Sequence, residues 1–234
     1  MRISLFRPIK AKAYLSYPWK NAYTTDNIYH GSSVGQKFGQ DDVCIDKATH
    51  TKYAMKLSTG CANGYESIYQ WLGLKGHNGI DIPCDFREPV FAAHDGIVMN
   101  VSKDRGKGIG CYVRTLKEFD YKTGLSYFKT GYWHFHEIVV EDGDYVEVGD
   151  LLGFGDTTGY STGNHLHFEL KPIYQENGVW QNKEQEMGYY GCADPLPYII
   201  EKDAEDRREE LDSIAEKLKI IAEKIKWLFT QINK

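Results

Sequence analysis

The sequence has no surplus of positive charge and no long hydrophobic run, and both absences exclude classes of protein. Its 234 residues carry 28 Lys and Arg against 33 Asp and Glu, a formal net charge of −5. Proteins that bind nucleic acid usually carry a basic surplus that neutralises phosphates, so no nucleic-acid partner is expected. No apolar run approaches the roughly 20 residues that a membrane-spanning helix needs, so no transmembrane segment is expected.

Cysteine is also scarce, and its pattern excludes two kinds of scaffold. The five cysteines include no Cys-x-x-Cys pair, which argues against a cysteine zinc site. Their odd number does not fit a full disulfide framework, so buried free thiols are favoured while one or two disulfides stay open. The first residues contain no apolar stretch typical of a secretory signal, because basic residues and Pro8 interrupt them.

Glycine and aromatic residues are abundant and favour a turn-rich, mainly β body. The chain has 23 Gly and 17 Tyr. Residues 1–34, which are punctuated by Pro and Gly, predict an irregular N-terminal segment, and residues 66–74 predict a short helix or a loop. From residue 76 onward, short apolar stretches between Gly-rich turns predict antiparallel strands. These cover residues 89–101, folded as a hairpin about Asp95-Gly96, and 111–116, 131–140, 151–154 and 164–170.

Residues 201–234 have the periodicity of an amphipathic helix. Acidic residues crowd its start and lysines its second half, which suits the helix dipole. Self-association of this helix or docking on a partner is favoured over packing against the body, and membrane contact is least expected. Apolar residues recur at alternating spacings of three and four, as in the a/d seam of a coiled coil, at Leu211, Ile214, Leu218, Ile221, Ile225, Leu228 and Ile232.

Two fragments carry residues with the chemistry of metal ligands. His165 and His167 are two apart in a predicted strand, so both imidazoles project from the same face. Taken alone, this pair is as consistent with structural histidines as with ligands. His77 and Asp81 lie in a predicted loop that enters a strand. Two imidazoles and one carboxylate, with a fourth position for water, are a common catalytic zinc set.

A third fragment adds His134 on another predicted strand. A hydrolytic zinc site needs a base for the attacking water and a donor for the developing oxyanion. Histidines outside the ligand set suit both tasks, because their pKa lies near neutrality.

The order of these fragments resembles the lysostaphin/LytM-type zinc metallopeptidases, which cleave peptide bonds in bacterial peptidoglycan. The resemblance covers roughly residues 35–200 and includes neither the N-terminal segment nor the C-terminal helix. It departs from the family at residues 84–87, where small residues are more typical, and this departure is expected to reshape the groove. The matching fragments are His-x-x-x-Asp at 77–81, Tyr-Trp-His-Phe at 132–135, the Gly-rich turns of 143–163, Asn-His-Leu-His-Phe-Glu-Leu at 164–170 and Asp-Pro-Leu at 194–196.

The resemblance implies a twisted antiparallel β domain over residues 35–200 with a groove above one sheet. It implies that His77, Asp81 and His167 bind zinc. By the same resemblance, His165 is the general base, and His134 assists the water or stabilises the oxyanion. The implied activity is a zinc-dependent endopeptidase acting on stem peptides or cross-bridges of peptidoglycan. The alternative is a catalytically inactive domain that binds cell wall or activates a partner hydrolase.

The implied substrate lies in the bacterial cell wall, in the extracellular space or periplasm, although the sequence shows no secretory signal. This combination indicates a protein carried on a phage virion or released by a holin. Other histidines and aromatic residues are expected to have ordinary structural roles. His136 is expected at the rim or in solvent and His94 in solvent, and core packing is favoured over groove lining for Tyr132, Trp133, Tyr160 and Trp180.

Overall fold

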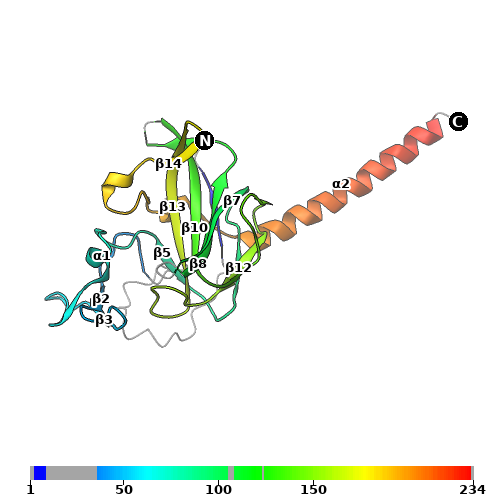
Figure 1. Ribbon diagram of the computed structural model, residues 1–234. Coiled ribbons are helices and arrows are strands. Elements are labelled where there is room, and N and C mark those ends of the chain that lie inside the picture. The colour runs from blue at the N-terminus through cyan, green and yellow to red at the C-terminus, as the bar shows by residue number, and fades with distance from the viewer. Residues whose placement is uncertain (1–2, 9–35, 105–107, 123, 233–234) are drawn as a thin grey trace.

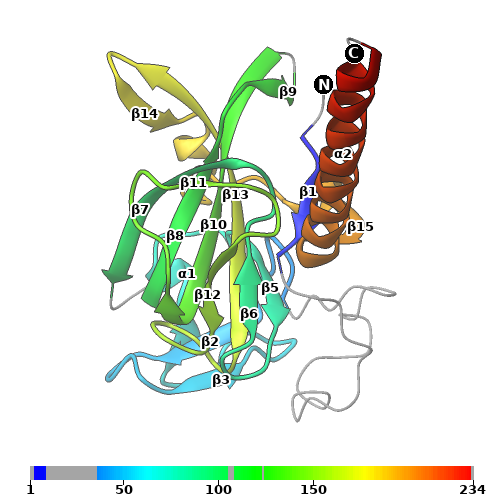
Figure 2. The ribbon, with the colours of Figure 1, turned by 90° about the vertical axis from the view of Figure 1, so that its right-hand side faces the viewer.

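The body is built mainly of antiparallel strands, and one long helix projects from it (Figures 1 and 2). The structure is a computed structural model and describes residues 3–8, 36–104, 108–122 and 124–232. The predicted mainly β fold is confirmed. Its principal elements are β1 (Leu5–Arg7), β2 (Val43–Asp46), β3 (Tyr53–Met55), β4 (Tyr65–Ser67), α1 (Ile68–Trp71), β5 (Ile80–Pro83), β6 (Pro89–Phe91), β7 (Gly96–Asp104), β8 (Gly108–Thr115), β9 (Phe119–Tyr121), β10 (Gly124–Ile138), β11 (Tyr145–Val146), β12 (Leu151–Gly155), β13 (His165–Glu176), β14 (Val179–Asn182), β15 (Ile199–Asp203) and α2 (Ala204–Ile232).

The large sheet is built around β10, which pairs antiparallel with β8, β9, β12 and β13. On β13, Leu166, Phe168 and Leu170 are fully buried in the hydrophobic core. Because side chains alternate along a strand, His165 and His167 lie on the opposite face. The packing of Leu166 and Phe168 into the core fixes the strand that carries both histidines.

The predicted hairpin at residues 89–101 is wrong. β6 pairs with β12, whereas β7 pairs with β8 and β11, so the two strands have different neighbours. Alternation of apolar residues marks a strand but does not say which strand it joins.

The prediction that His94 is solvated is also wrong, because residues 89–101 do not form the hairpin whose turn would have exposed it. His94 is buried between the Asp95 carbonyl oxygen, 2.8 Å from Nδ1, and Thr130 Oγ1, 3.0 Å from Nε2.

A small accessory module, residues 36–74, precedes the sheet strands that carry the metal-binding motifs. Its strands β2, β3 and β4 form a three-stranded sheet, and α1 begins after Ser67, whose side chain accepts a hydrogen bond from the Gln70 N–H. A disulfide joins Cys44 to Cys61, while the other three cysteines are buried thiols. The module has its own core of Val43, Ile45, Ile68, Tyr69 and Leu74.

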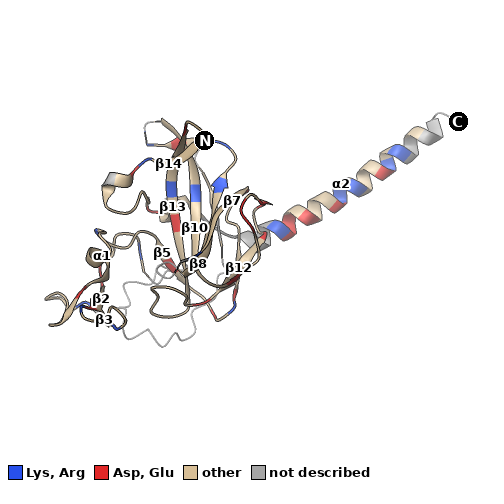
Figure 3. Cartoon of the chain, viewed as in Figure 1, with Lys and Arg blue, Asp and Glu red and all other residues tan. Residues whose placement is uncertain are grey.

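The first described strand, β1, pairs parallel with β15, the strand that directly precedes α2. A strand at Leu5–Arg7 departs from the predicted irregular segment, whose residues 9–34 lie outside the described part of the chain. The helix α2 begins at Ala204 rather than at 201, because β15 occupies the preceding residues. Bands of acidic and basic residues follow one another along it (Figure 3). Within the described residues, no helix is long and apolar enough to cross a membrane.

Candidate metal centre

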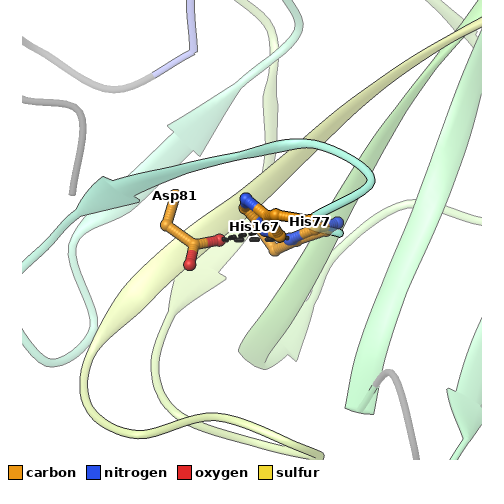
Figure 4. A group of neighbouring side chains, drawn as sticks. All are labelled: His77, Asp81 and His167. Carbon is orange, nitrogen blue, oxygen red and sulfur yellow. Dashed lines mark hydrogen bonds and ion pairs between the residues drawn. The ribbon is translucent and has the colours of Figure 1, made fainter. Parts of the chain in front are cut away.

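Three predicted ligands converge at one point between β5 and β13 (Figure 4). His77 Nε2 lies 2.8 Å from His167 Nδ1 and 3.2 Å from Asp81 Oδ1, and His167 Nδ1 lies 3.1 Å from the same oxygen. Asp81 and His167 are directly opposite each other in the β5–β13 pairing, while His77 comes from the loop before β5. Two imidazoles and one carboxylate therefore present their donor atoms to a common centre.

The loop approaches β13 closely because it contains Gly79. A Cβ atom at this position would lie 2.6 Å from the Phe168 carbonyl oxygen and 2.9 Å from the His167 ring. Such distances are well inside van der Waals contact, so no larger residue fits without displacing the loop or the ring. The glycine allows the loop to bring His77 against His167.

Each histidine ligand is held through the nitrogen that faces away from the centre. His77 Nδ1 lies 3.2 Å from the Lys37 carbonyl oxygen, which can only accept a hydrogen bond, so this nitrogen carries the proton. His167 Nε2 lies 3.4 Å from Glu169 Oε1. With these outer nitrogens protonated, His77 Nε2 and His167 Nδ1 offer lone pairs to the centre. This donor set fits a zinc ion.

The charges around the centre keep the carboxylate ionised. Burial would raise the pKa of Asp81, but the neighbouring His165 and His77, with the His167 hydrogen bond, hold that pKa well below its usual value. Burial would lower the pKa of His167, but hydrogen bonds to Asp81 and Glu169 raise it above its ordinary value. Asp81 therefore presents an anionic carboxylate to the centre at neutral pH.

The two remaining predicted residues, His165 and His134, lie beside the ligands. Their ring centroids are 4.7 Å apart, and His165 Nε2 is 3.4 Å from Asp81 Oδ1. His165 Nδ1 lies 2.8 Å from the Gly163 carbonyl oxygen, and His134 Nδ1 lies 2.6 Å from that of Thr158. Because carbonyl oxygens only accept, both histidines are protonated at Nδ1, which leaves Nε2 as the acceptor when each ring is neutral.

A backbone irregularity in β10 accompanies His134. The residue has a φ of 71°, in the left-handed region, and the β10–β8 register shifts between Trp133 and Phe135. A bulge of this kind re-aims a side chain that regular alternation would send elsewhere. Burial, with the nearby His165 and His167, holds the pKa of His134 well below its usual value, and burial also lowers the pKa of His165. Both rings are consequently neutral at neutral pH.

The sequence of this region matches a known family of peptidases. Residues 75–183 match the model of peptidase family M23. These residues form a peptidase family M23 domain. Lysostaphin from Staphylococcus staphylolyticus is 31% identical over 161 residues, 65% of this chain and 28% of lysostaphin. Peptidoglycan DD-endopeptidase ShyC from Vibrio cholerae is 30% identical over 109 residues, 47% of this chain and 22% of that protein.

The matches thus span only about a quarter of the length of these curated relatives. Among solved structures, the catalytic domain of the antimicrobial peptidase lysostaphin from Staphylococcus simulans is also similar to this chain. It is 21% identical, with a TM-score of 0.45, and the similarity covers 78% of this chain and 96% of that one.

A cavity of about 190 Å³ opens beside the His-Asp-His cluster of the M23 domain. One wall comes from the accessory module, which contributes apolar side chains including Tyr53, Ile68 and Leu72. Trp71 of the module meets Tyr160 edge to face at 5.3 Å, which joins the module to the loop before His165. Trp133 and Tyr160 line this cavity, whereas Tyr132 is fully buried in the core.

A buried polar network that was not predicted from the sequence lies behind His167. Glu169 is fully buried, accepts hydrogen bonds from Asn78 Nδ2 at 2.8 Å and Tyr112 Oη at 2.7 Å, and lies 3.3 Å from Lys171 Nζ. The signal was present, because Glu169 and Lys171 continue the alternation that places His165 and His167 on one face. No pattern in the sequence indicated Tyr112, which comes from β8.

The residues at 84–87, where the sequence departs from the family pattern, differ in burial: Cys84 is buried in the core, whereas Phe86 is exposed. Phe86 meets His136 edge to face at 5.0 Å, and Arg87 pairs with Glu137 at 3.1 Å. His136 is partly exposed and lies 3.1 Å from Asp156 Oδ2. Neither His136 nor any of residues 84–87 lines the cavity beside the His-Asp-His cluster.

Proposed function

We propose that the chain is a zinc-dependent endopeptidase that hydrolyses peptide cross-links of bacterial peptidoglycan. The observation that carries this proposal is the convergence of His77, Asp81 and His167, whose donor atoms all lie within 4.8 Å of one another. His165 and His134 stand directly beside them. The M23 domain and the peptidoglycan endopeptidase among its relatives support a cell-wall substrate and action at the cell wall.

His77, Asp81 and His167 would hold the ion. When bound, zinc supplies Lewis-acid polarisation of the substrate carbonyl and acidifies water. The protein contributes the orientation of the ligands through Lys37 and Glu169. It also contributes an apolar wall, from the accessory module, that limits access of bulk water to the cavity.

His165 is the proposed general base. Its Nε2 faces the cluster, because the Gly163 carbonyl oxygen holds Nδ1–H on the other side. A neutral imidazole in this orientation can accept the proton of the attacking water and pass it to the leaving amine. His134 is held in the same way by Thr158. A neutral His134 can accept a hydrogen bond from the attacking water at Nε2 and so orient that water.

The proposal is tested by digesting purified peptidoglycan and measuring the release of new amino groups. Zinc-loaded protein should release them, a chelator should stop the release and added zinc should restore it. His165→Ala and His134→Ala should each lower the rate on the order of 10²-fold or more. His136→Ala is the matched control, because this histidine does not line the cavity, and it should keep most of the activity.

The alternative function, an inactive domain, predicts a different result in the same assay. Such a protein would bind the cell wall and release no amino groups at any zinc concentration, which would refute the proposal. Mass spectrometry of the products identifies which bond is cut, because glycine bridges and stem peptides leave different new termini.

A further inference from the structure

One face of α2 exposes large apolar side chains along its length. Ile214, Leu218, Ile221 and Ile225 are 43%, 60%, 51% and 47% exposed. They occupy alternating d and a positions of the predicted seam. The side chains of Leu228 and Ile232, which continue the pattern, lie outside the described set. A continuous apolar stripe of this size on a soluble helix marks an interaction surface.

We propose that this seam binds other copies of the same chain in a parallel helical bundle. Every described seam position is Leu or Ile, and the e positions beside the seam, Ala215, Ala222 and Phe229, are all apolar. Knobs of this kind fit the holes of an identical helix, and apolar flanking residues widen the surface that association buries. The first two heptads have Leu at a and Ile at d, which favours more than two strands, whereas the third has Ile225 at a and Leu228 at d.

The charges beside the seam favour a parallel orientation. Lys217 and Lys224 occupy the g positions, and the e positions opposite them in a parallel bundle, five residues further along the partner helix, are Ala222 and Phe229. In an antiparallel pair, g positions face g positions, which would place Lys217 of one copy beside Lys224 of the next. Like charges in this place oppose association, so the parallel arrangement is preferred.

The outer face of α2 needs no partner for its charges. Glu216 pairs with Lys219 at 4.0 Å and Glu223 with Lys226 at 2.9 Å, both within the helix. These residues occupy b and f positions, away from the seam. Association along the seam therefore buries apolar side chains and leaves these ion pairs in water.

The start of α2 is tied to the body, and the rest extends away from it (Figure 1). Arg208 contacts Glu147 and lies 3.3 Å from Asp150, both in the body. In a parallel bundle, the M23 domains of all copies would consequently gather at the N-terminal end of the helices. The helices themselves would extend together away from these domains.

Adjacent isoleucines provide a matched test. Ile221 lies in the seam, whereas Ile220, at 48% exposure, occupies the c position outside it. Sedimentation of the full chain at tens of micromolar should give masses of three or four protomers for the unaltered protein and for Ile220→Glu. Ile221→Glu should give the mass of a monomer. A monomeric unaltered protein, or equal behaviour of the two variants, would overturn the proposal.

Two further measurements guard against misfolding and test the orientation. The circular dichroism and zinc content of Ile221→Glu should equal those of Ile220→Glu, because neither side chain belongs to the core. Ile225→Cys should form a disulfide with its own counterpart in a parallel bundle. Crosslinking only between Ile214→Cys and Ile225→Cys chains would show an antiparallel pair and refute the proposed orientation.

Discussion

Imidazole orientation at the site depends on hydrogen bonds made behind each ring. His77, His134 and His165 each use a backbone carbonyl oxygen, whereas His167 uses the side chain of Glu169. A carboxylate in this position raises the basicity of a ligand and fixes its tautomer more strongly than a carbonyl does. The buried charge of Glu169 is balanced by Lys171. Burial would lower the pKa of Lys171, but the charge of Glu169 raises that pKa well above its usual value.

Glu169→Gln should weaken zinc binding about 10- to 100-fold, because an amide is a poorer acceptor for His167 and leaves Lys171 without its buried counter-charge. Zinc affinity is measured by competition with a chromophoric chelator. The matched control is Glu176→Gln, at the exposed end of the same strand, which should bind zinc normally. Equal affinities for the two variants would refute a positioning role for Glu169.

Gly79→Ala should lower both stability and zinc content, because the added methyl group meets the Phe168 carbonyl oxygen and the His167 ring. Overpacking of this kind typically costs about 1–3 kcal/mol in the free energy of unfolding. Gly124→Ala is the control, since a Cβ there meets no atom within 4 Å. Urea unfolding and metal analysis of both variants check the expectation, and normal zinc content in Gly79→Ala would contradict it.

His94 should make stability fall in weak acid. Burial lowers its pKa, although the Asp95 carbonyl oxygen and charge oppose the shift. The unfolded chain therefore takes up a proton near pH 6.5 that the folded chain does not, and the stability from neutral His94 is lost as pH falls below that value. The stability difference between the unaltered protein and His94→Asn should shrink between pH 7.5 and 5.0. A difference independent of pH would contradict this.

Elements that follow one strict period could be predicted from the sequence. The alternation in β13 predicted the shared face of His165 and His167, and applied further it would have included Glu169. The bulge in β10 could not be predicted, because a shift of one residue depends on the registers of both neighbouring strands. The β6 and β7 pairings were missed because tertiary partners decide them.

The accessory module is the element whose stability depends most on a covalent link. The Cys44–Cys61 disulfide spans 17 positions, and a loop of about this length typically contributes ~3 kcal/mol to the free energy of unfolding. Replacing both cysteines by serine should raise amide hydrogen exchange in residues 36–74 while leaving zinc bound. Reductant should have the same effect on the unaltered protein and none on the double variant. Unchanged exchange after reduction would contradict this role.

At the scale of the whole molecule, the body that contains the M23 domain and the projecting helix have separate proposed tasks. The helix and its seam could be predicted because their period is local, whereas β1–β15 pairing joins residues nearly 200 positions apart.

If the proposed bundle forms, several sites act on one polymer, and rebinding of a tethered neighbour raises apparent affinity. Ile221→Glu should then lose activity on insoluble peptidoglycan and keep it on a soluble cross-linked peptide. Equal losses on both substrates would contradict this.

The central claim is that His77, Asp81 and His167 together hold the zinc ion that hydrolysis requires. Metal analysis of purified protein, paired with the amino groups it releases from peptidoglycan, tests this claim most directly. The unaltered protein should bind about one zinc ion per chain, as a three-ligand site does. Asp81→Ala should lose the zinc and the hydrolysis together while keeping the β-rich circular dichroism of the fold. Full hydrolysis by zinc-free Asp81→Ala would contradict the account.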